Sequence, residues 1–291
     1  MFFRKQDNLT DDLQKKFILR LGELSGRPST STLHIHPVLN STNEFGVPDN
    51  QVSTISSLAR KKLFVPNPRE KRKYDAAAWH SDIQFEPCPA DYTSLRLVQL
   101  PETGGDTLWA SGYDIFDRFS KPYQEFLEKL TATFIGDGFL RAAAEGRARL
   151  YTEPRGSPEN VGGELLVVHP IVRTNPVTGW KSIYSIGSFP KYINELHTEE
   201  SDEILKKLHQ TILANHDLQV RFKWKDANDI GKSARDTWLR GSSVSSVNLP
   251  LTITCSYLGQ SQRLPRGHIR LRWSRRAVWQ PCGRYWRASI S

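Results

Sequence analysis

The stretch Ser94-Leu95-Arg96-Leu97-Val98-Gln99-Leu100 constrains the fold most, because apolar and polar residues alternate along it almost without interruption. A period of two residues predicts a β-strand with one face toward a core. Weaker strand patterns recur through the middle of the chain, at 33–37, 76–85, 107–109, 164–172, 180–186 and 218–224. Asn175-Pro176-Val177-Thr178-Gly179 has the composition of a turn between two of them.

Helical patterns flank these strands on both sides in the sequence. Asn8 or Thr10 can cap a first helix that runs to about Leu21. Leu13, Phe17 and Leu21 recur at helical spacing and predict its buried face. A second amphipathic pattern covers 113–130, and Thr198 can cap a third helix over 199–213. We therefore expect a mainly β fold, a sandwich or jelly roll, with helices packed outside.

The composition fits one large domain of 291 residues with no apolar run near the roughly 18 residues of a membrane span. Three cysteines form no paired framework, and charges follow the initial methionine where a secretory leader would be apolar. We expect a cytoplasmic protein. The start Phe2-Phe3-Arg4 resembles the end of a strand, so we also expect the chain to begin part-way through an element.

The net charge of +9 invites a nucleic-acid interpretation, but its distribution argues against one. Residues 256–291 contain eight Arg and no Lys, Asp or Glu, so the rest of the chain is nearly neutral. A domain of 1–230 without a basic surface is typical of an enzyme. We expect no nucleic-acid partner and no membrane contact.

His80-Ser81-Asp82 is the strongest candidate for chemistry. In an extended segment, residues two apart project to the same face, so one imidazole and one carboxylate meet one ion. Zinc hydrolases need a further His or Cys nearby as a metal ligand, and the sequence shows no such cluster. Two His and one carboxylate on one face hold non-haem Fe(II). Taken alone, such a pair is more often a structural histidine beside a surface aspartate.

Four motifs in order give the pair a context: Trp79-His80-Ser81-Asp82, Gly104-Gly105-Asp106-Thr107-Leu108-Trp109, His169-Pro170-Ile171-Val172-Arg173-Thr174 and Asn215-His216. Together they resemble the TauD/TfdA family of Fe(II)- and 2-oxoglutarate-dependent dioxygenases, in its fungal sulfonate-dioxygenase branch. The resemblance implies a double-stranded β-helix (jelly-roll, cupin-like) core. It implies Fe(II), 2-oxoglutarate and O2 as cofactor and co-substrates, and hydroxylation of a small organic molecule such as a sulfonate.

By the same resemblance, His80 and Asp82 are iron ligands, and the Thr107 hydroxyl binds the distal carboxylate of 2-oxoglutarate. Trp79 and Trp109 either pack around the site or serve the core alone. Taurine dioxygenase itself has a substrate-binding Asn where this chain has Ala76, so the resemblance does not imply taurine. We interpret three other histidines as structural: His34, His36 and His169.

The resemblance stops after Ile230. The family continues there with a strand, the second iron histidine and an arginine for 2-oxoglutarate, whereas this chain reads Gly231-Lys232-Ser233-Ala234-Arg235. His268, the one later histidine, has no family context. Codons shifted by one nucleotide from Tyr257 onward permit the family sequence, including the missing histidine. Our hypothesis is that 231–255 is a translated intron and 256–291 an out-of-frame exon.

This hypothesis predicts a core that is incomplete at the C-terminus, with a poorly packed tail that replaces at least one strand. It also predicts an impaired or inactive enzyme, because the chain lacks the third iron ligand. A non-catalytic remnant or binding module on the same fold is the alternative. A nucleic-acid-binding protein that acts through the Arg-rich tail is the third hypothesis. The sequence leaves the oligomeric state open.

Overall fold

The computed structural model describes residues 1–39, 41–42, 48–53, 63, 79–99, 104–225, 229–234, 237–241 and 253–254. For 41–42, 232–234, 237–241 and 253–254 it describes the backbone only. All of these residues belong to one compact unit, Met1–Ser261. A second unit, Gln262–Ser291, lies outside the described residues.

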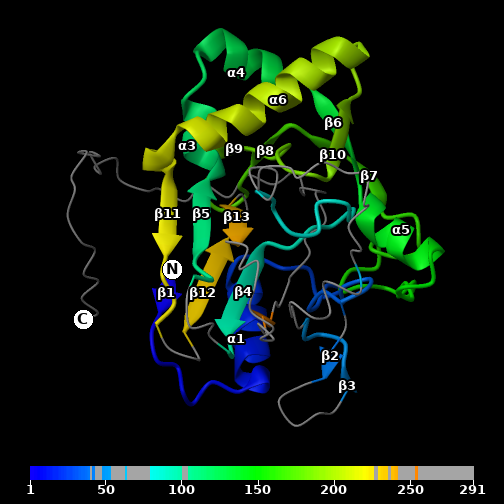
Figure 1. The fold of residues 1–291 in the computed structure, drawn as a ribbon, viewed down its shortest axis with the longest axis vertical. Helices are drawn as coiled ribbons and strands as arrows, with labels where there is room; N and C mark the ends of the chain where they lie inside the picture. The colour runs from blue at the N-terminus through cyan, green and yellow to red at the C-terminus, as the bar shows by residue number, and fades with distance from the viewer. Residues whose placement is uncertain are drawn as a thin grey trace. The chain divides into compact units, whose positions relative to one another are not determined.

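Antiparallel strands form the body of the described unit (Figure 1). One four-stranded sheet has the order β1 (Phe2–Phe3), β12 (Ile230–Ala234), β4 (Tyr92–Leu97) and β14 (Ile253–Thr254). A three-stranded sheet has the order β11 (Gln219–Phe222), β5 (Thr107–Ser111) and β13 (Thr237–Gly241). Another has the order β10 (Pro190–Ile193), β6 (Thr131–Ile135) and β7 (Leu166–Pro170). Two small pairs complete the set: β2 (Ser41–Thr42) with β3 (Pro48–Asp49), and β8 (Val172–Thr174) with β9 (Lys181–Ile183).

The helices include α1 (Asp11–Leu24), α3 (Gly112–Asp117), α4 (Lys121–Leu127), α5 (Asp137–Ala144) and α6 (Thr198–Ala214), with the 3-10 turn η2 (His216–Leu218). Helices α3, α4 and α6 lie together at one end of the strands, α5 lies at the side near β7, and α1 packs against β4 (Figure 1). The predicted architecture, mainly β with flanking helices, is confirmed. Among the described residues, no helix is both long enough and apolar enough to cross a membrane.

Strand β4 begins and ends close to the predicted alternating stretch, and both of its faces are buried. Leu95 and Leu97 enter a hydrophobic cluster on one face. On the other face α1 covers the polar residues: Gln14 donates to the Ser94 hydroxyl at 3.0 Å, and Arg96 pairs with Asp11. A helix that carries polar partners therefore buries the face that alternation alone would leave to solvent.

The same contacts correct the predicted face of α1. Its buried residues are Asp11, Gln14, Ile18 and Gly22, whereas Leu13 and Phe17 are exposed. The side of α1 that contacts polar groups of β4 faces inward. The spacing of the apolar residues therefore predicted the wrong buried face. The cap was predicted correctly, since the Thr10 side chain accepts from the Leu13 N–H at 3.2 Å.

Three other element predictions were wrong in detail. The helix expected over 113–130 is two helices, because Ser120 begins α4 and a proline occupies its first turn. His197, not Thr198, is the N-cap of α6. The stretch 33–37 makes one isolated bridge and no strand.

The core has two main clusters of buried side chains. One gathers Trp79 with residues of α3, α6, β6 and β9, among them Ile115, Leu208 and Ile183. The other gathers Ile83 and Phe85 with β4, β5 and β11, including Trp109 and Trp224. The segment 79–85 contributes to both clusters. It is therefore held by apolar packing on two sides.

Candidate active site

The segment that carries His80 and Asp82 is a turn rather than the predicted strand. Of the predicted 76–85, the first three residues lie outside the described ones, His80 makes a single bridge, and 82–85 are turn. Ile83 adopts a φ of 49°, which a β-branched residue rarely does. Strain of this kind persists where the surroundings impose it, and here Ile83 is held in the core.

His80 and Asp82 nevertheless point at one another. The His80 Nε2 lies 3.4 Å from Asp82 Oδ1, and their side chains are 38% and 20% exposed. Imidazole and carboxylate donors bind divalent first-row ions such as zinc at about 2.0–2.2 Å, so two adjacent ligands lie roughly 3 Å apart. The pair therefore fits a single metal ion, reached from solvent. Within the described residues, no group of three or more His, Cys, Asp and Glu side chains could hold a metal.

The backbone at Gly187 packs against the backbone of the residues that lead into this pair. Its φ is +96°, and a Cβ built there would lie 2.5 Å from the Trp79 carbonyl oxygen and 3.2 Å from the His80 Cα. The backbone of 187 thus passes against the backbone of 79–80 with no room for a side chain. The indole of Trp79 is fully buried in the core cluster on the same stretch.

Thr107 begins β5 and is buried. Its Oγ1 accepts a hydrogen bond of 2.9 Å from the indole N–H of Trp224. Since a hydroxyl has one proton to donate, this contact directs the Thr107 O–H away from Trp224 and toward another acceptor. The neighbouring Asp106 accepts from Arg221 at 2.6 Å. Strand β5 and the 79–85 segment both contribute residues to the two core clusters.

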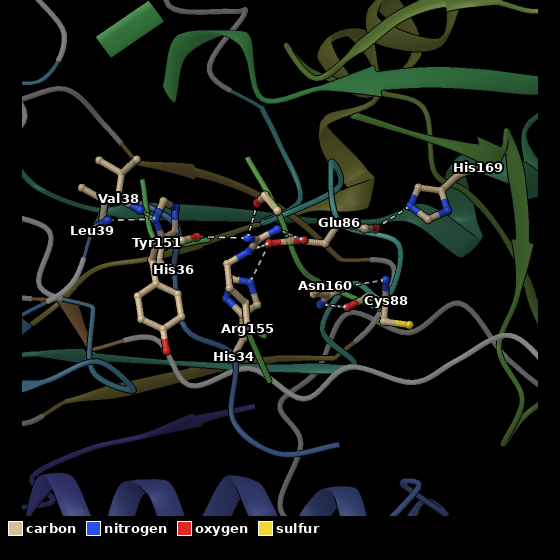
Figure 2. A network of polar contacts seen from close by, with 11 residues as sticks. His34, His36, Val38, Leu39, Glu86, Cys88, Tyr151, Arg155, Asn160 and His169 are labelled. Carbon is tan, nitrogen blue, oxygen red and sulfur yellow. Dashed lines mark hydrogen bonds and ion pairs between the residues drawn. The ribbon is translucent and has the colours of Figure 1, made fainter. Parts of the chain in front are cut away.

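A buried polar network surrounds Glu86, four residues after Asp82, and the sequence analysis missed its two central residues (Figure 2). Glu86 and Arg155 form a two-point ion pair, with Nε–Oε1 at 2.6 Å and Nη2–Oε2 at 2.9 Å. His34 contacts the same carboxylate at 3.1 Å, and the His169 Nε2 lies 2.9 Å from the Glu86 carbonyl oxygen. His36 accepts from the N–H groups of 38 and 39. All three histidines thus have structural partners, as interpreted.

Burial and neighbouring charges shift the pKa values of three groups in this network, His36, Glu86 and His169. Burial lowers the pKa of His169 to about 3, with help from the charge of Arg173, so its imidazole is neutral. Burial likewise holds the pKa of His36 well below its usual value. Burial alone would raise the pKa of Glu86, but hydrogen bonds and charges from His34 and Arg155 outweigh it and lower that pKa.

Ala76 and His268, which the sequence analysis weighed for the site, lie outside the described residues. The backbone after Ile230 does occupy sheet positions. Strand β12 pairs with β1 and β4, and β13 pairs with β5 in the register Trp238↔Ala110. The side chains of these strands beyond Gly231 are not described, so the predicted poor packing of the tail stays a prediction.

Known proteins place the chain in a family. The family model described as "Taurine catabolism dioxygenase TauD, TfdA family" matches residues 1–230. The alpha-ketoglutarate-dependent dioxygenase btcD of Neocamarosporium betae is 46% identical over 240 residues, which cover 79% of this chain and 68% of that protein. The alpha-ketoglutarate-dependent sulfonate dioxygenase of Saccharomyces cerevisiae is 35% identical over 150 residues, 52% of this chain and 34% of that protein.

Solved structures agree on the fold. The crystal structure of AAD-2 in complex with Mn(II) and N-oxalylglycine matches with a TM-score of 0.61 at 22% identity, over 91% of this chain and 84% of that one. The predicted jelly-roll class is thereby confirmed. Because the family model covers most of the sequence, this chain belongs to the TauD/TfdA family of dioxygenases, oxidoreductases that use Fe(II), 2-oxoglutarate and O2.

Proposed function

We propose that residues 1–230 carry the Fe(II)- and 2-oxoglutarate-dependent site of a dioxygenase that hydroxylates a small organic molecule of the sulfonate class. The observation that carries the proposal is the separation of 3.4 Å between His80 Nε2 and Asp82 Oδ1. The sulfonate class rests on the sulfonate dioxygenases named among the relatives.

In this proposal, His80 and Asp82 hold the iron, which when bound supplies the oxidation of a substrate C–H bond coupled to decarboxylation of 2-oxoglutarate. Thr107 donates its hydroxyl proton to the distal carboxylate of 2-oxoglutarate, and the N–H of Trp224 fixes the direction of that hydroxyl. A hydrogen bond to a charged group is stronger than one between neutral groups, so this single donor contributes to binding even without a cation.

We further propose that this chain is impaired as written, in keeping with the division into 1–230, 231–255 and 256–291. Two observations support this. The family match ends at residue 230, and no third side chain among the described residues completes a metal site. With two of the three ligands of a facial triad, we expect weak metal binding. We place the protein in the cytoplasm, with a small-molecule substrate and no nucleic-acid partner.

A titration with Co(II), in the absence of oxygen and followed by its visible absorption, tests the metal assignment. The chain, His80→Ala and Asp82→Ala are compared, each with and without 2-oxoglutarate. We expect weak binding that both substitutions abolish, and a change in the spectrum when 2-oxoglutarate is added. Metal binding that survives both substitutions would refute the assignment of these ligands.

A non-catalytic binding module on the same fold is the second candidate, favoured by the incomplete ligand set among the described residues. The same titration separates the two. A module that has lost the chemistry shows no 2-oxoglutarate-dependent change in the Co(II) spectrum, whereas an impaired dioxygenase shows one.

A further inference from the structure

Glu86, four residues after Asp82, contacts side chains from three segments that are distant in the sequence. Its carboxylate accepts from His34 and Arg155, and its carbonyl oxygen from His169. Its own N–H donates to the Ile83 carbonyl at 3.0 Å. Glu86 is fully buried, and each of its three partners is at most 4% exposed. Residue 83 directly follows Asp82, so Glu86 is connected to the metal pair through a single backbone hydrogen bond.

The segment 151–162 also binds the chain at Cys88, two residues after Glu86. Cys88 and Asn160 exchange two hydrogen bonds of 2.8 Å, from the Cys88 N–H and to its carbonyl oxygen. Arg155 also donates to the carbonyl oxygens of Tyr151 at 3.0 Å and Gly162 at 2.7 Å. The guanidinium therefore ties the Glu86 carboxylate to the backbone of its own loop (Figure 2).

At Gly156 the backbone of this loop packs against the segment 32–34, which bears His34. The Gly156 carbonyl accepts from the Thr32 N–H at 2.7 Å. A Cβ at 156, where φ is +82°, would lie 2.5 Å from the Leu33 carbonyl oxygen. The loop and the 32–34 segment thus approach backbone to backbone, and Glu86 lies between their side chains.

We propose that Glu86 and Arg155 are positioning residues, which hold the 80–86 turn in the one conformation that lets His80 and Asp82 share an ion. The proposal rests on the proposed function. A buried ion pair is a weak source of net stability, but it specifies one geometry when every hydrogen bond is satisfied. Arg155 satisfies this condition with four bonds, and the strained φ of Ile83 needs such an anchor.

A matched pair elsewhere in the fold provides the control. Asp11 and Arg96 also form a buried ion pair between distant segments, on α1 and β4, both of which lie outside 80–88 in the sequence. Glu86→Gln is therefore compared with Asp11→Asn, and Arg155→Met with Arg96→Met. Arg155→Lys, which keeps the charge, is the milder variant if Arg155→Met does not fold.

Two readouts are taken on the full 291-residue chain: the Co(II) dissociation constant, and amide hydrogen exchange of 79–88. Outer residues that orient metal ligands typically contribute 10- to 100-fold to metal affinity. We expect Glu86→Gln and Arg155→Met to weaken Co(II) binding about tenfold and to speed exchange in 79–88. The two control variants should change Co(II) affinity less than twofold, at a comparable loss of melting temperature.

Equal effects of the two pairs on Co(II) affinity and on exchange would overturn the proposal, because Glu86 would then act through general stability alone. The outcome for the proposed function is read separately. Binding that does not depend on His80 refutes the metal assignment, while faster exchange of 79–88 specific to the Glu86 and Arg155 variants still supports the positioning role.

Discussion

Gly187→Ala is the substitution that most directly tests how the metal pair is supported. The added Cβ would lie 2.5 Å from the Trp79 carbonyl oxygen and 3.5 Å from the His80 Cβ. Over-packing of this kind costs about 1–3 kcal/mol. The left-handed φ of +96° adds about 1–2 kcal/mol for an L-residue. We therefore expect the free energy of unfolding to fall by about 2–5 kcal/mol.

Gly179→Ala separates the two contributions. Gly179 has a φ of +73°, but a Cβ there meets nothing within 4 Å. This control should lose only the conformational part, about 1–2 kcal/mol. Urea unfolding followed by tryptophan fluorescence measures both variants, and Co(II) titration tests whether Gly187→Ala also displaces His80. A loss for Gly187→Ala no larger than for Gly179→Ala would refute the close approach of the two backbones.

Three further outcomes are expected. His169 has a pKa of about 3 when folded and about 6.5 when unfolded, so the unfolded chain binds more protons between these values. Its contribution to stability is complete above pH 6.5 and is lost as the pH falls toward 3, by about 1.4 kcal/mol per unit. Unfolding of His169→Gln should show a pH slope shallower by that amount, and an unchanged slope would contradict the assignment. Trp224→Phe removes the donor to Thr107 and should cost about 1–3 kcal/mol in urea unfolding. Trp109→Phe, which loses an N–H that donates to none of the described residues, should cost less, and the reverse order would count against the role of Trp224. Sequencing of the transcript across the codons of Ile230 to Tyr257 should find messages that lack the segment, and its presence in every isoform would sink the intron hypothesis.

Local patterns predicted the parts of the fold that depend on local causes. The Thr10 cap, the strand at 107 and the turn at 175–179 follow from hydrogen bonding and turn chemistry within a few residues. The strands β6 and β10 escaped prediction, and both pair with strands that are distant in the sequence. The helix α5 also escaped prediction, and it spans only eight residues.

The site divides in the same way. The spacing of His80 and Asp82 made them candidates for metal binding, and only the family resemblance assigned them to iron and Thr107 to 2-oxoglutarate. Glu86 and Arg155 were not found, because a charge 69 positions from its partner leaves no local signal. Burial is what makes them important, and burial of a charge is visible only in the structure. The turn at 82–85 was mistaken for a strand for a related reason, since its conformation is imposed by the core around Ile83 and Phe85.

The central claim is that this chain carries two ligands of an iron triad without the third. The most direct test measures 2-oxoglutarate-dependent O2 consumption, with Fe(II) and a panel of sulfonates. It compares the 291-residue chain with the protein translated after excision of the proposed intron between the codons of Gly231 and Ser256. We expect no turnover by the 291-residue chain and turnover by the spliced product that His80→Ala abolishes. Turnover by the 291-residue chain itself would contradict the account.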